Sequence, residues 1–134
     1  MNKSAIREIT FKLLYSIEVQ KEAGEEEIEI FLNENEINEQ IKKEIKEEIN
    51  GISTNNEEII KLISKNLKSD WQIERISKVN IALLKLAIYE IMNKKIPFKI
   101  VINEVVELAK LYGEETSSSF INGVLASVVK ENNI

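Results

Sequence analysis

The stretch from Val79 to Met92 constrains the fold more than any other part of the chain. Its fourteen residues are apolar except for Asn80, Lys85 and Glu90, so a helix formed there is apolar on nearly every side. Such a helix has to be surrounded by other elements, because contact on one side alone would leave apolar surface in water. We therefore expect this helix at the centre of the core.

The remaining apolar residues also recur with helical spacing. Residues three or four positions apart share one face of a helix. Stripes of this kind are Ile6, Ile9, Leu13 and Ile17; Ile37, Ile41, Ile45 and Ile49; Ile59, Ile60, Ile63 and Leu67; Val101, Val105, Leu108 and Tyr112; and Ile121, Val124, Leu125 and Val128. No segment alternates with the period of two that a strand requires. The pattern predicts an all-α, compact helical domain of about seven helices.

Glycines and capping residues indicate where these helices begin and end. Gly24 and Gly51 are each expected just past the end of a helix, the first of which runs from about Lys3 to Glu22. Thr54–Glu57 has the pattern of a capping box for the next helix. Further along the chain, the sequence predicts a short apolar bridge of Trp71, Ile73 and Ile76, a helix start at Pro97, a helix end at Gly113 and an N-cap within Thr116–Ser118.

Two absences remove most catalytic chemistry. The chain has no Cys and no His, which excludes a cysteine nucleophile, a thiolate zinc site, a Ser-His-Asp triad and an imidazole-bound metal. Glu104 and Glu107 lie one helical turn apart and could hold a cation, but surface or capping contacts are the simpler interpretation. There is no glycine-rich phosphate loop. We therefore expect no enzyme activity, no cofactor and no metal.

Charge is distributed unevenly along the chain. The net charge is −5, yet residues 23–58 alone carry three Lys and twelve Glu, so the rest of the chain could still present a basic face. Charged residues interrupt the first twelve positions, which argues against a signal peptide, and no run is long and apolar enough to span a bilayer. A cytoplasmic protein without membrane association is the expectation.

A few residues have the chemistry for binding single-stranded RNA, which needs cations and stacking aromatics. Lys3 and Arg7 supply the cations and share a helical face, while Tyr15 and Phe120 supply aromatic rings. Each also has a simpler interpretation. The two rings adjoin apolar stripes and could be core residues, and the two cations could be ordinary solvated charges.

The order and spacing of several motifs resemble the family of the transcription antitermination protein NusB. The motifs are Arg7-Glu8, Leu14-Tyr15, Trp71 through Arg75, Leu84 through Glu90, Ile96-Pro97, Ile102 through Lys110, Tyr112-Gly113 and Phe120 through Leu125. The resemblance implies two helical subdomains, at about 1–70 and 71–134. It also implies binding of boxA-type single-stranded RNA of ribosomal RNA leader transcripts with the small-subunit ribosomal protein NusE, in the RNA polymerase elongation complex with other Nus factors.

The resemblance also assigns roles to particular residues. The family's arginine-rich start corresponds to Lys3 through Arg7, and its RNA-contacting aromatic corresponds to Phe120, so Lys3, Arg7 and Phe120 are the expected RNA-binding residues. Tyr15, Glu74 and Asn80 are the expected partner-binding residues.

Two departures from the family pattern leave an alternative open. Ser4, Ala5 and Ile6 stand where several members have further basic residues, and Asn80 stands where an acidic residue is usual. The alternative is a helical protein–protein interaction module with little or no RNA binding of its own.

Overall fold

The computed structural model describes residues 1–21, 24–68 and 70–134, and these residues form seven α-helices and one 3-10 helix with no strand. The helices are α1 (Lys3–Gln20), α2 (Glu25–Glu34), α3 (Glu39–Thr54), α4 (Asn56–Lys65), the 3-10 helix η1 (Ile73–Arg75), α5 (Lys78–Met92), α6 (Phe98–Tyr112) and α7 (Ser117–Glu131). The all-α class and the helix number predicted from the sequence are confirmed.

Helix α5 is the centre of the molecule, as its sequence predicted. All residues from Ile81 to Ile88 are buried, and α5 packs against α1, α3, α4, α6 and α7. Because neighbours cover it on every side, it has no solvent face to keep polar. Its two buried charges, Lys85 and Glu90, therefore need partners within the protein.

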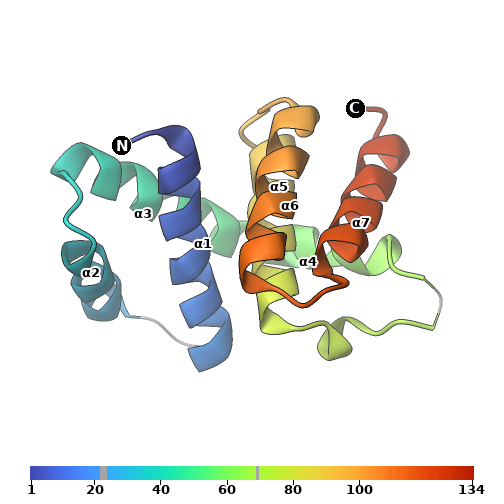
Figure 1. The fold of residues 1–134 in the computed structure, drawn as a ribbon, viewed down its shortest axis with the longest axis horizontal. Helices are drawn as coiled ribbons and strands as arrows, with labels where there is room; N and C mark the ends of the chain where they lie inside the picture. The colour runs from blue at the N-terminus through green and yellow to red at the C-terminus, as the bar shows by residue number, and fades with distance from the viewer. Residues whose placement is uncertain (22–23, 69) are drawn as a thin grey trace.

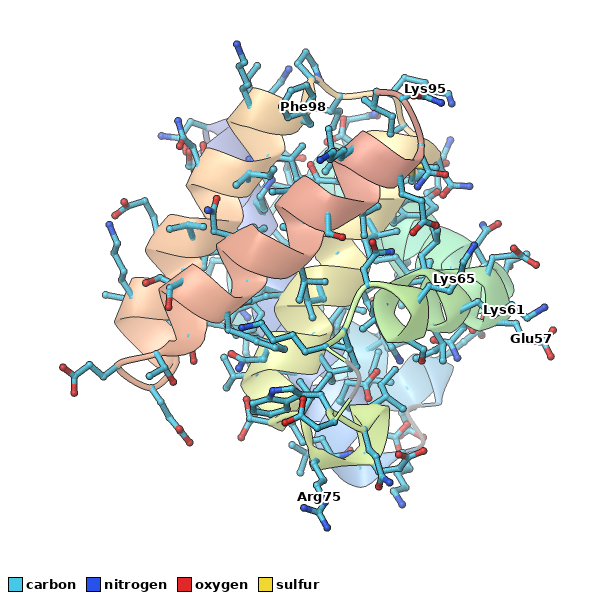
Figure 2. All side chains as sticks on the ribbon, turned by 90° about the vertical axis from the view of Figure 1, so that its right-hand side faces the viewer. Glu57, Lys61, Lys65, Arg75, Lys95 and Phe98 are labelled. Carbon is cyan, nitrogen blue, oxygen red and sulfur yellow. The ribbon has the colours of Figure 1, made fainter. Side chains whose placement is uncertain are left out.

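The other helices lie on two sides of this centre. Figure 1 shows α1, α2 and α3 on one side and α4, α6 and α7 on the other, with α2 at the outer edge. Helix α1 packs against α5, so the buried side chains form one continuous core from Ile9 to Val128. Glu57 and Lys61 project outward from α4 (Figure 2).

Gly51 does not end a helix, contrary to the sequence prediction. Helix α3 continues through it to Thr54, and a Cβ atom at position 51 would collide with the phenol ring and hydroxyl of Tyr89 on α5. The glycine therefore allows close approach of α3 and α5. The predicted capping box at Thr54–Glu57 is also wrong, because Thr54 is still helical and the N-cap residue, Asn55, makes no side-chain capping bond.

The end of α1 also differs from its prediction. The helix ends at Gln20, and Lys21 adopts a left-handed conformation with φ 62° while its N–H donates to the carbonyl of Ile17. The predicted last residue, Glu22, lies outside the described residues. Gly24 stands at the N-cap of α2 rather than at the end of α1.

The boundaries in the second half agree better with the sequence. Pro97 is the N-cap of α6, Gly113 is its C-cap, and Thr116 is the N-cap of α7. The Thr116 side chain makes no capping bond, and just before the helix the N–H of Glu114 donates to the hydroxyl of Ser117. Within the described ranges, no helix is both long and apolar enough to cross a membrane.

Candidate nucleic-acid interface

Arg7 is buried and already bound to a carboxylate. It lies on the α1 face turned toward α5, and its Nη2 donates to Oε1 of Glu90 over 2.7 Å while its Nε lies 3.0 and 3.1 Å from the two carboxylate oxygens. The two side chains are only 8% and 2% exposed. Burial alone would lower the pKa of Arg7, but the hydrogen bonds and charge of Glu90 outweigh burial and raise this pKa.

This pair lines a cavity of about 300 Å³ between α1, α3 and the end of α5. Nζ of Lys94 lies 2.5 Å from Oε1 of Glu48 there. Burial, followed by the nearby charge of Glu90, raises the pKa of Glu48. The charged side chains in the cavity wall are Lys3, Arg7, Lys94, Glu44, Glu48 and Glu90. Three cations thus face three carboxylates, which leaves little net attraction for a phosphate.

The phosphate contact predicted for Arg7 conflicts with this placement. A phosphate would have to displace Glu90 from a buried bidentate pair, and Nη1 of Arg7 also lies 3.6 Å from Glu104. We assign Arg7 a structural role. Lys3, the first residue of α1, is exposed as expected.

Phe120 lies in the first turn of α7 and is partly buried against Trp71. The two ring centroids are 5.6 Å apart, with a tilt of 36°. Trp71 was expected in an apolar bridge, but 48% of it is exposed. In Figure 1 α1 begins near the top of the view and α7 begins near the bottom. Lys3 and Phe120 therefore do not form one compact pocket, and only an extended ligand could contact both.

Tyr15 is at the edge of the core rather than inside it. It is 38% exposed, and its ring centroid lies 6.3 Å from that of Phe11, which in turn lies 5.3 Å from that of Tyr112 on α6. The hydroxyl of Tyr112 donates to Glu8, and Nζ of Lys12 lies 5.6 Å from the Tyr112 ring centroid. These contacts place aromatic and charged groups of α1 and α6 side by side at the surface.

Glu74 and Asn80 flank the start of α5. Glu74 is exposed in η1, and Asn80 lies in the first turn of α5, where its N–H donates to Oγ of Ser77 over 3.1 Å. The Oδ1 atom of Asn80 is buried and has no hydrogen-bond partner among the described residues. Across the described part of the chain, no group of acidic residues is arranged to hold a metal ion.

Residues 4–130 match the family model described as NusB family. The chain belongs to the NusB family. It is 47% identical over 131 residues to the transcription antitermination protein NusB of Acetivibrio thermocellus, covering 97% of this chain and 90% of that protein. It is 42% identical over 130 residues to the protein of that name from Clostridium acetobutylicum, covering 96% of each.

Solved NusB structures have the same fold. The structure of T. maritima NusB matches with a TM-score of 0.88 and 34% identity, over 98% of this chain and 92% of that chain. A structure of the antitermination factors NusB and NusE in complex with dsRNA matches with a TM-score of 0.86 and 27% identity, over 96% of each chain. The fold predicted from the sequence is thus that of NusB proteins, which are named as antitermination factors.

Sequence reasoning missed the roles of three residues near the candidate sites, Glu90, Lys12 and Trp71. Glu90 carried a signal, since a carboxylate in an otherwise apolar helix needs a cation nearby. Lys12 is exposed, on the same helix as Lys3, and contacts the Tyr112 ring. Trp71 carried no signal for exposure, because a tryptophan among isoleucines is more often buried.

Proposed function

We propose that this chain is a non-catalytic antitermination factor that binds boxA-type RNA of ribosomal RNA leader transcripts together with the small-subunit ribosomal protein NusE. It would act in the cytoplasm, within the RNA polymerase elongation complex and with other Nus factors. The observation that carries the proposal is the likeness, over 96% of each chain, to a structure in which NusB and NusE are in complex with dsRNA.

The proposed RNA contacts lie along α1 and at the start of α7. Lys3 and Lys12 are exposed cations that could each neutralise a phosphate, and Phe120 offers an aromatic ring to an unpaired base. Arg7 supports these contacts indirectly, because its pair with Glu90 fixes α1 on α5. We propose Tyr15, Glu74 and Asn80 as contacts of the protein partner.

A second candidate function rests on the charges. Net charge is −5, and the guanidinium of Arg7, a buried cation of α1, is already neutralised within the protein. Both features weaken attraction to a polyanion. They favour a helical protein-interaction module whose RNA affinity comes mainly from its partner.

A ternary binding assay separates the two functions. Labelled boxA-type single-stranded RNA is titrated with the chain alone, with NusE alone and with the mixture, and a scrambled RNA and a duplex of the same sequence serve as controls. The proposed function requires the mixture to bind boxA-type RNA more tightly than either protein alone and more tightly than the scrambled RNA. If the chain binds NusE without increasing RNA affinity, the interaction-module function replaces it.

A further inference from the structure

Gly123 occupies a position in α7 that packing within the protein does not explain. It lies in the interior of a fifteen-residue helix, where glycine is the poorest helix former apart from proline. A Cβ atom built at position 123 would meet no atom within 4 Å, whereas one at Gly51 would collide with Tyr89. Gly51 is therefore accounted for by a neighbour inside the protein, and Gly123 is not.

Gly123 lies one helical turn after Phe120, on the same helix. Phe120 and Gly123 are three positions apart, so they share a face of α7. A side chain at position 123 would lean back toward the turn that carries Phe120. Ile121 and Leu125, which are fully buried, lie on the opposite side of the helix from Gly123, while Asn122 and Gly123 are exposed.

Trp71 completes this surface from another part of the chain. Its ring stands 5.6 Å from that of Phe120 and is 48% exposed, although an indole gains more from burial than almost any other side chain. The two adjacent rings, tilted by 36°, and the helix position without a side chain one turn away leave an accessible apolar surface. We call Trp71, Phe120 and Gly123 the ring platform.

The charges around the ring platform decide which part of a nucleic acid it suits. Asp70 and Glu74 flank Trp71, and Glu114 and Glu115 precede α7, against the cations Lys68 and Arg75. Arg75 points outward from η1 (Figure 2). This balance is unfavourable for phosphates. Stacking on a base requires no cation, since every base has a flat π face.

We propose that the ring platform holds an unpaired RNA base, with Trp71 as a second stacking residue beside Phe120 and Gly123 as the position that lets the nucleotide approach the helix. This inference rests on the proposed RNA-binding function and adds Trp71 and Gly123 to the stacking contact proposed there for Phe120.

The lone tryptophan of the chain makes the site directly measurable. The complex with NusE is titrated with single-stranded boxA-type RNA, and binding is followed by the anisotropy of labelled RNA and by tryptophan emission. The emission of a Trp71→Phe complex is subtracted to isolate Trp71. We expect RNA to change the emission of Trp71, and Trp71→Ala to weaken RNA binding about five- to a hundred-fold. Trp71→Phe should retain most of the affinity because it keeps a ring.

Gly123→Ala tests the site without damaging the fold. Because the new methyl group meets nothing and alanine favours helix, the melting temperature should rise by about 3–5 °C, while RNA binding weakens at least about fivefold. Weaker binding by a more stable protein cannot result from misfolding. Matched controls are Ala126→Gly, exposed one turn further along α7, and Ile30→Ala, 53% exposed on α2. Both should bind RNA as the wild type does.

The outcomes distinguish the site from the proposed function. If wild-type complex binds RNA but the Trp71 emission and the affinities of Trp71→Ala and Gly123→Ala are unchanged, the ring platform is not a base site and the proposed function still stands. If Gly123→Ala weakens NusE binding instead, the surface belongs to the protein partner and the inference is overturned. If wild-type complex binds no RNA, the proposed function fails first.

Discussion

The carboxylate of Glu90 in α5 accepts three hydrogen bonds from the guanidinium of Arg7 in α1, from a residue 83 positions earlier in the chain. Both side chains are buried, so each charge is neutralised by the other and solvent screens their attraction little. Removing one partner would leave the other charge buried without its main counterion.

Arg7→Ala should therefore destabilise the fold strongly. Breaking a buried pair in this way costs about 3–5 kcal/mol, whereas replacing both partners by apolar residues of similar volume is often neutral. Urea unfolding of Arg7→Ala, Glu90→Leu and the double variant Arg7→Met/Glu90→Leu measures these losses. The structural role assigned to Arg7 is contradicted if Arg7→Ala unfolds at the wild-type midpoint.

Glu48 should make stability depend on pH. Burial raises its pKa above the ordinary value of 4.5, so folding favours the protonated form. Its contribution is fully present below pH 4.5 and is lost as pH rises through the raised pKa. In Glu48→Gln this dependence is absent. Unfolding free energies measured from pH 4 to pH 8 should therefore show the wild type losing stability relative to Glu48→Gln as pH rises, and a constant difference would contradict the raised pKa.

Gly51→Ala should destabilise the protein, although alanine is the better helix former. The added methyl group collides with Tyr89, and overpacking of this kind typically costs about 1–3 kcal/mol. Thermal melts of Gly51→Ala and Gly123→Ala form a matched pair, since the same chemical change meets a packed neighbour in one helix and open space in the other. Melting shifts of the same sign would show that the environment of Gly51 is not as described.

Tyr15→Ala should weaken binding of the protein partner at least tenfold. Removing an aromatic anchor from an interface commonly costs about 2 kcal/mol or more. The fold should persist, since Tyr15 is 38% exposed. Calorimetry with NusE measures the change, and Val19→Ala, 51% exposed one turn further along α1, is the matched control. Equal affinities for the two variants would leave Tyr15 with an ordinary packing role.

Salt dependence should separate the cations from the rings. Each phosphate neutralised on a single strand contributes about −0.7 to the slope of log affinity against log salt, so Lys3→Ala and Lys12→Ala should each flatten the slope by roughly 0.7. Phe120→Ala should weaken binding by about 1–3 kcal/mol at an unchanged slope. Lys61→Ala, on the outer side of α4, is the control for non-specific charge effects. A slope unaffected by both lysine changes would remove α1 from the RNA interface.

Local pattern was enough to predict the helices but not the pairs that fix the site. The apolar run of α5 predicted its central position, because a helix that is apolar on all sides must be surrounded by other elements to keep apolar surface out of water. Gly51 was misread because a glycine after an isoleucine repeat resembles a helix end, and the reason for it, Tyr89, is 38 positions away. Likewise, Lys3 and Arg7 share a face of α1, and only the packing of α1 on α5 determines that Arg7 rather than Lys3 contacts Glu90.

The packing of α1 on α5 has a second, partly buried ion pair, between Lys85 and Glu18, whose side chains are 10% and 18% exposed. Along α1 the cation Arg7 comes before the anion Glu18. Along α5 the cation Lys85 likewise comes before the anion Glu90. Opposite charges therefore meet only when the two helices run antiparallel. If α1 docked with the reverse polarity, Arg7 would face Lys85 and Glu18 would face Glu90, so both contacts would become repulsive. The two charge pairs therefore favour the direction in which α1 packs on α5 over its reverse.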